Sequence, residues 1–82
     1  MVLVDVFVPS VDKTYNFSLN EKVIIEDVIS EIVEMIEQKE KCNLLGDKKD
    51  MHLYSTRNSS MLPGKNTLID CFVTSGTRLV LV

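Results

Sequence analysis

Hydrophobic residues dominate the first segment of the chain, residues 2–8, which is rich in β-branched side chains and stops at Pro9. This composition is typical of a β-strand. Asp5 sets the phase of the strand, because its charged side chain faces water and strand side chains alternate between two faces. The core-facing positions are then Val4 and Val6, and the outer positions are Leu3 and Phe7.

A second alternation follows the turn at residues 9–13. Tyr15, Phe17 and Leu19 alternate with polar residues, and a spacing of two predicts a second strand. Because the intervening turn is short, the two strands should form a hairpin.

From residue 25 to about residue 41 the hydrophobic spacing becomes that of an amphipathic helix, and no Gly or Pro interrupts it. The apolar arc of this helix contains Ile25, Val28, Ile29, Ile32, Val33, Met35 and Ile36. The opposite arc contains Glu26, Asp27, Ser30, Glu31, Glu34, Glu37 and Gln38. We therefore expect one helix that covers a sheet with its apolar arc.

The second half of the chain predicts shorter elements. Residues 43–50 read as a polar loop, residues 51–55 as a third strand and residues 61–62 as a brief fourth strand. A short helical turn over residues 67–70 begins with a threonine, whose hydroxyl caps free backbone N–H groups. Residues 77–82 are too apolar for an edge strand and should lie in the middle of the sheet.

This order of elements predicts a two-layer α+β domain in which one helix packs on a mixed sheet of about five strands. The first and last strands are the most apolar, so they should pair at the centre of the sheet. A β-grasp arrangement of a single domain over residues 1–82 satisfies these constraints.

Composition excludes several classes of protein. The chain has 82 residues, of which 45% are hydrophobic and 26% charged, as in a globular domain. Its net charge of −3 argues against a nucleic-acid binder, which must neutralise phosphates. No apolar run approaches the length of a membrane span and no secretory signal is visible, so we expect a cytoplasmic protein without direct membrane insertion.

Several segments resemble the ubiquitin-like family. They are Thr67-Leu68-Ile69-Asp70-Cys71 followed by residues 75–82, and the stretch from Tyr15 to Ile32. Within that family the chain is most similar to YukD-like proteins of bacterial type VII secretion systems. The features that carry this likeness are Asp5, Val6, Val8 and Pro9, the Tyr15/Phe17/Leu19 strand and the Asp70-Cys71 pair. The resemblance implies an accessory protein that docks to a secretion component, such as a membrane-bound ATPase or a pseudokinase-like subunit, or that has a regulatory role.

Two departures from family patterns carry expectations. Phe72 stands where the resemblance leads us to expect glycine, so the local loop should differ. The sequence ends on its last strand at Val82, without the Gly-Gly tail that conjugated ubiquitin and the sulfur carriers use. We therefore expect neither conjugation nor sulfur transfer.

Candidate catalytic residues are sparse, and we expect no enzyme and no cofactor. His52 is the only histidine and is expected on a sheet surface, solvated or at a binding face. Cys71 follows Asp70, and a neighbouring carboxylate raises the pKa of a thiol, the wrong direction for a nucleophile. Cys42 and Cys71 lack the spacing of a zinc site, so we expect reduced thiols and no metal.

The strand phases predict a binding surface. If Val4, Val6, Leu53, Leu79 and Leu81 face the helix, an outer patch forms that contains Leu3, Phe7, Tyr54, Val80 and Val82. Such apolar patches often mark interaction sites, and ubiquitin-like domains commonly bind through this face. Coverage by a loop, ordinary surface scatter and self-association as a homodimer remain alternatives.

The polar arc of the helix is a second candidate surface. Residues 26–40 contain six acidic residues and one lysine, and the acidic face comprises Glu26, Asp27, Glu31, Glu34 and Glu37. This face either steers a basic partner or is simply solvated.

Three functions follow from these observations. The first is a non-catalytic accessory protein that binds a protein partner in type VII secretion. The second is a subunit or a regulator of another multicomponent enzyme. The third is a carrier or modifier that requires processing at its C-terminus.

Overall fold

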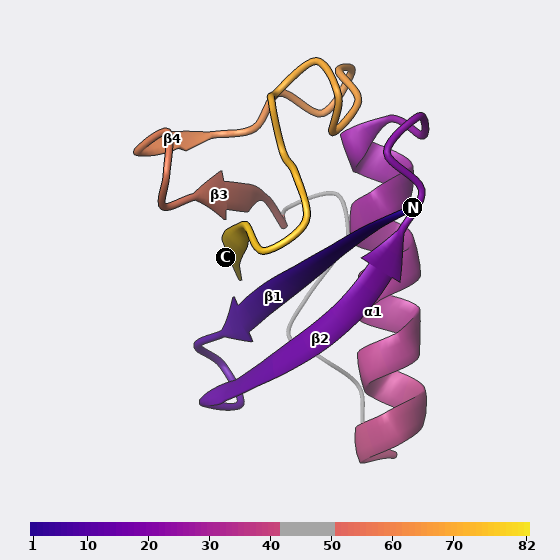
Figure 1. The fold of residues 1–82 in the computed structure, drawn as a ribbon. Coiled ribbons are helices and arrows are strands. Elements are labelled where there is room, and N and C mark those ends of the chain that lie inside the picture. The colour runs from indigo at the N-terminus through magenta and orange to yellow at the C-terminus, as the bar shows by residue number, and fades with distance from the viewer. Residues whose placement is uncertain (42–50) are drawn as a thin grey trace.

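The computed structural model describes residues 1–41 and 51–82. The described elements are β1 (Val2–Val8), β2 (Lys13–Leu19), α1 (Ile25–Glu40), β3 (Leu53–Ser55), β4 (Ser60–Met61) and β5 (Arg78–Leu81). The helix lies against one side of the sheet, beside the β1–β2 hairpin (Figure 1). The predicted loop at residues 43–50 lies outside the described residues.

The five strands form one mixed sheet in the order β2-β1-β5-β3-β4. The two central strands, β1 and β5, are parallel, and the other neighbours are antiparallel. The prediction that the first and last strands pair at the centre is therefore confirmed. A central strand loses water from its backbone on both edges, which suits the apolar sequence of β5.

The core lies between the helix and one face of the sheet. Val4, Val6 and Val8 of β1 alternate with exposed or half-buried residues, which confirms the phase predicted from Asp5. The fully buried side chains of the other strands and of the helix include Leu19, Ile25, Val28, Ile32, Ile36, Leu53, Leu79 and Leu81. Met35 is only partly buried, at the margin of the apolar arc.

The loop before β5 satisfies the N-terminus of α1. Ile24 at the N-cap makes no side-chain hydrogen bond to the helix. Instead, the N–H groups of Ile25 and Glu26 donate to the carbonyl oxygens of Asn66 (2.7 Å) and Gly64 (3.0 Å). These bonds supply acceptors for N–H groups that a helix leaves unpaired at its start. A Cβ at Gly64 would lie 2.7 Å from Cγ of Glu26, so this close approach favours glycine.

The helix ends one residue earlier than predicted. Lys41 is the C-cap, with a left-handed backbone (φ 54°), and its N–H donates to the carbonyl oxygen of Glu37. The bond satisfies one of the carbonyl groups that the last turn leaves free.

The short strands β3 and β4 differ from their predicted bounds. β3 begins at Leu53, although His52 still pairs with Val82 through two backbone hydrogen bonds of 2.7 and 2.9 Å. β4 covers Ser60–Met61, because Leu62 turns into the core and is 5% exposed.

The predicted helical turn at residues 67–70 is a hydrogen-bonded turn and not a helix. Thr67 Oγ1 accepts from the N–H of Asp70, and Asp70 Oδ2 accepts from the N–H of Thr67. The threonine therefore caps the turn as expected. The segment is too short to form a helix, because fixing the backbone of the first helical turn costs more free energy than the hydrogen bond of that single turn contributes.

Candidate functional site

Cross-strand register brings apolar residues of four strands into one line on the outer face of the sheet. Phe7 is opposite Val80, Val80 is opposite Tyr54, and Tyr54 is opposite Met61. In the two antiparallel pairs such directly opposed residues have Cβ atoms about 4.5–5.5 Å apart, and the parallel strands β1 and β5 are direct neighbours, so the four side chains stand side by side. These four residues are called the outer row below.

The outer row is accessible from solvent. Phe7, Val80 and Tyr54 are partly buried, whereas Met61 is 51% exposed at the sheet edge. The buried positions of β1, β3 and β5 point to the opposite side, toward α1. The sequence prediction missed Met61, although the brief strand at residues 61–62 was a signal for it.

Val82 borders the outer row, since it follows Val80 on the same face and is 47% exposed. Leu3 does not adjoin it. Although Leu3 is 62% exposed and faces the same side, Asp5 stands between it and Phe7. Two same-face steps separate Leu3 from Phe7 by about 13 Å along the strand. The prediction that all five patch residues lie together is therefore wrong for Leu3.

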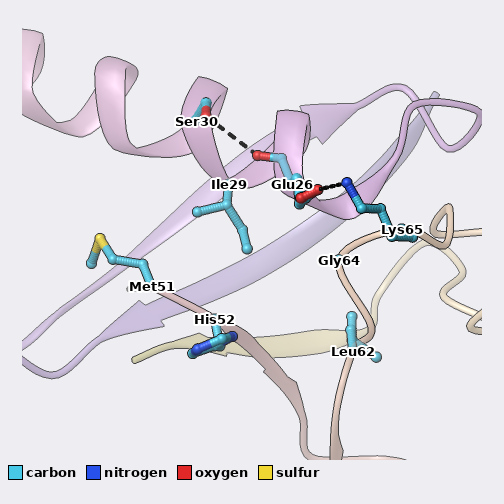
Figure 2. Close-up of a pocket in the computed structure, with 8 residues that line it drawn as sticks. All are labelled: Glu26, Ile29, Ser30, Met51, His52, Leu62, Gly64 and Lys65. Carbon is cyan, nitrogen blue, oxygen red and sulfur yellow. Dashed lines mark hydrogen bonds and ion pairs between the residues drawn. The ribbon is translucent and has the colours of Figure 1, made fainter. Parts of the chain in front are cut away.

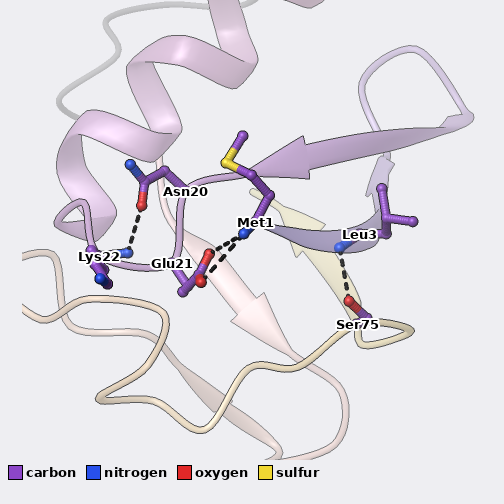
Figure 3. Close-up of polar contacts among 6 residues, drawn as sticks. All are labelled: Met1, Leu3, Asn20, Glu21, Lys22 and Ser75. Atoms are coloured by element: carbon purple, nitrogen blue, oxygen red, sulfur yellow. Dashed lines mark hydrogen bonds and ion pairs between the residues drawn. The ribbon is translucent and has the colours of Figure 1, made fainter.

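The neighbourhood of Leu3 is polar. Its N–H donates to Ser75 Oγ at 3.2 Å (Figure 3). Its carbonyl oxygen accepts from the N–H of Gly76 at 2.7 Å. Nearby, the N-terminal amine of Met1 forms an ion pair of 3.0 Å with Glu21 (Figure 3). The pKa of Glu21 is lowered by a backbone hydrogen bond and by this amine.

The acidic face of α1 is partly engaged with the rest of the chain. Glu26 forms a 2.8 Å ion pair with Lys65, and this carboxylate raises the pKa of Lys65. Asp27, Glu31 and Glu34 are exposed, and Glu37 is half-buried. The exposed part of the acidic face therefore includes Asp27, Glu31 and Glu34, whereas Glu26 forms an ion pair with Lys65 of the loop before β5.

A pocket of about 380 Å³ opens beside the helix N-terminus (Figure 2). Ile29 and Leu62 supply apolar wall, and the Glu26–Lys65 ion pair stands at one end. His52 lines the pocket with an exposed side chain, which agrees with the surface position predicted for it. The carboxylate of Glu26 faces Lys65, so it is not positioned to orient the imidazole of His52.

Among residues 1–41 and 51–82, no cluster of three or more His, Cys, Asp or Glu side chains could hold a metal ion. The helix described in this part of the chain is also not long and apolar enough to cross a bilayer.

Comparison with known proteins bears on the fold. No family model matches the chain, and no curated protein matches its sequence. Among solved structures, the ubiquitin-like domain of Arabidopsis thaliana protein At2g32350 superposes with a TM-score of 0.73 at 18% identity, covering 99% of this chain and 74% of that one. The N-terminal ubiquitin-like domain of the 4931431F19Rik protein gives a TM-score of 0.76 at 16% identity, covering 99% of this chain and 72% of that one.

The fold is ubiquitin-like. One helix packed on a five-stranded mixed sheet is the β-grasp arrangement that the sequence predicts. At identities of 16–18% the likeness concerns the fold alone.

Within this ubiquitin-like fold, Cys71 is a poor nucleophile. Its side chain is 8% exposed and forms no disulfide. Burial raises the pKa of the thiol, and the negative charge of Asp70 raises it further. The direction predicted from the Asp70–Cys71 pair is confirmed, with burial as the larger cause. Cys42 lies outside the described residues.

Phe72 adopts a left-handed backbone conformation, with φ of 58°. That is the conformation glycine accepts without strain, so the loop has a glycine-type backbone although the residue is phenylalanine. The ring is 81% exposed, and Ile69 in the same turn is 50% exposed. The resemblance to ubiquitin-like proteins singled out this position, but nothing in the hydrophobic pattern predicted its exposure.

Proposed function

We propose that this chain is a non-catalytic ubiquitin-like protein that binds another protein through the outer face of its sheet. The observation that carries the proposal is the outer row, with Val82 beside it. Monomeric soluble proteins seldom expose contiguous apolar patches without a use for them.

The composition of the outer row suits a binding centre. Phe7 and Tyr54 are aromatic, and aromatic residues are enriched among the few side chains that carry most of the energy of an interface. Met61 adds a flexible apolar side chain that adapts to different partners. Because strand backbones hold these residues, little conformational entropy is lost when a partner covers them.

We further propose that the partner is a component of a type VII secretion system. This step rests on the resemblance to YukD-like proteins carried by residues 5–9, residues 15–19 and the Asp70-Cys71 pair. An ATPase or a pseudokinase-like subunit at the membrane is the proposed partner. Genes for small helical WXG proteins and an FtsK-like ATPase beside the gene for this chain would support the assignment.

The test uses two half-exposed residues whose substitution leaves the core intact. Met61→Lys and Val82→Lys place a charge on the outer face, at the edge of the outer row and beside it, and Gln38→Lys adds the same charge to an exposed site on α1, on the other side of the sheet. Tagged wild-type protein and the three variants are incubated with membrane and cytoplasmic extracts of the native cells. The captured protein is identified by mass spectrometry, and its affinity is then measured with purified components.

We expect both outer-face variants to bind about 30-fold more weakly or worse, because a buried unpaired charge replaces an apolar contact. Gln38→Lys should bind as wild type. Equal binding by all four proteins would overturn the role of the outer face. If the captured protein is unrelated to secretion and both outer-face variants fail to bind it, the role of the outer face stands and the secretion assignment is overturned.

A further inference from the structure

A second pocket lies where the β3–β4 turn meets the loop that leads into β5. It has a volume of about 390 Å³ and is bounded by Thr56 and Arg57 on one side and by residues 74–78 on the other. Neither the sequence motifs nor the proposed binding face makes use of it.

Two arginines, Arg57 and Arg78, are among the residues that line this pocket. Both residues are exposed, and neither side chain forms an ion pair or hydrogen bond with any residue that the structure describes. No acidic residue is part of the lining. Asp5 is the cross-strand neighbour of Arg78, but its carboxylate accepts a hydrogen bond from Asn16 on the other side. The pocket is therefore a local concentration of positive charge in a chain whose net charge is −3.

Hydroxyl groups add further donors. Ser75 Oγ accepts from the N–H of Leu3 at 3.2 Å (Figure 3), and Thr77 Oγ1 accepts from the N–H of Thr74 at 3.1 Å. A hydroxyl has one proton as well as two lone pairs. Within the described part of the chain, neither hydroxyl donates its proton to a protein acceptor. Ser75 is exposed and Thr77 is 7% exposed, so the Ser75 hydroxyl is the more accessible of the two to a ligand.

The loop that carries these groups is held in place. The N–H of Gly76 donates to Leu3 at 2.7 Å, and the N–H of Thr77 donates to the carbonyl oxygen of Thr74 at 3.1 Å. On the other wall, both the N–H and the hydroxyl of Thr56 donate to the carbonyl oxygen of Arg78. The two walls are therefore linked directly, and the donors need little reorganisation to meet a ligand.

We propose that this pocket binds an oxyanion, a phosphate or carboxylate group carried by a ligand. Guanidinium groups match both in geometry, because their planar N–H groups donate two parallel hydrogen bonds. The hydroxyls of Ser75 and Thr77 complete a set of donors with no competing acceptor charge. The site does not depend on the proposed function, since a small anion would bind without any protein partner.

The experiment titrates the ¹⁵N-labelled chain with sodium phosphate and, separately, with sodium acetate, at constant ionic strength set with chloride. We expect saturable shifts of the backbone amides of residues 56–57 and 74–78. Saturation with phosphate alone would show that the pocket selects a phosphate group. Saturation with acetate as well would show that it also accepts a carboxylate.

Arg57→Gln and Arg78→Gln each remove one guanidinium and should bind the anion about tenfold more weakly, as expected when a charge-assisted hydrogen bond is lost. Lys22→Gln makes the same change of charge at an exposed residue outside the pocket and should bind as wild type. Arg78→Lys keeps the charge without the planar donors and should give an intermediate affinity.

The proposal is overturned if neither anion gives saturable shifts at these amides. It is equally overturned if Lys22→Gln weakens binding as much as the arginine variants, because the effect would then be one of net charge. Matching spectra of the variants away from the pocket establish that each retains its fold.

Discussion

Phe72 offers a test of whether the turn before β5 is strained. Its backbone is left-handed (φ 58°) and its ring is 81% exposed. Replacing it with glycine and, separately, with alanine removes the ring in both cases. The difference in stability between the two variants therefore reports the backbone and not the lost contacts of the ring.

The magnitude follows from two opposing terms. A left-handed residue with a Cβ costs about 1–2 kcal/mol relative to the right-handed conformation, and glycine avoids most of that cost. Glycine in turn loses about 0.5–1 kcal/mol more conformational entropy on folding than alanine. The difference leaves Phe72→Gly more stable than Phe72→Ala by about 1 kcal/mol. For a domain of this size that corresponds to a Tm about 4–8 °C higher.

Thermal and urea denaturation followed by circular dichroism measure both quantities. The control is Ser10, an exposed residue of the β1–β2 turn that is not among the described residues with positive φ. There the order should reverse, with Ser10→Ala more stable than Ser10→Gly. If Phe72→Ala is as stable as Phe72→Gly, or more so, the inference of backbone strain at this turn is refuted.

Two further predictions concern titratable groups. In a Cys42→Ser variant, Cys71 is the remaining thiol. We expect Ellman's reagent to modify it slowly in the folded state and fast in denaturant, because burial and Asp70 raise the pKa of the thiol. Equal rates in the two states would contradict this. Hydrogen bonds from Tyr15 and Lys13 lower the pKa of Glu40 from its ordinary value. They therefore stabilise the fold above the unfolded-state pKa, and this stabilisation is lost as pH falls through the folded-state pKa. The stability gap between wild type and Tyr15→Phe, measured by urea denaturation, should therefore narrow on acidification, and a gap that is constant with pH would count against the assignment.

Alternation was sufficient to predict much of the fold. The charge of Asp5 fixed which side of β1 is buried, and the apolar sequence of β5 predicted its central position. The helix was equally well defined, because its apolar arc extends over four turns without Gly or Pro. These features are local and periodic, so they are visible in a single sequence.

The candidate sites were less predictable because they depend on register and on turns. Periodicity placed Leu3 on the outer face, but only pairing across strands shows Asp5 between it and Phe7. Met61 joined the outer row because β4 pairs with β3 in the register that sets Met61 opposite Tyr54. The arginine pocket has no sequence signature, since its walls are brought together by the pairing of β3 with β5.

On the outer face of the sheet, the residues that folding requires differ from those that binding requires. Beside the outer row, the same face has a polar row in which Asn16, Asp5 and Arg78 are in register across β2, β1 and β5. The sheet therefore tolerates charged and polar side chains at this surface, so its stability does not demand apolar residues one step further along the strands. The outer row is partly buried, but the part of Phe7, Val80, Tyr54 and Met61 that remains in water gains nothing for the fold, because the hydrophobic effect rewards only area removed from solvent. That gain becomes available when a partner covers the row, and for this reason a charge at Met61 should impair binding far more than folding.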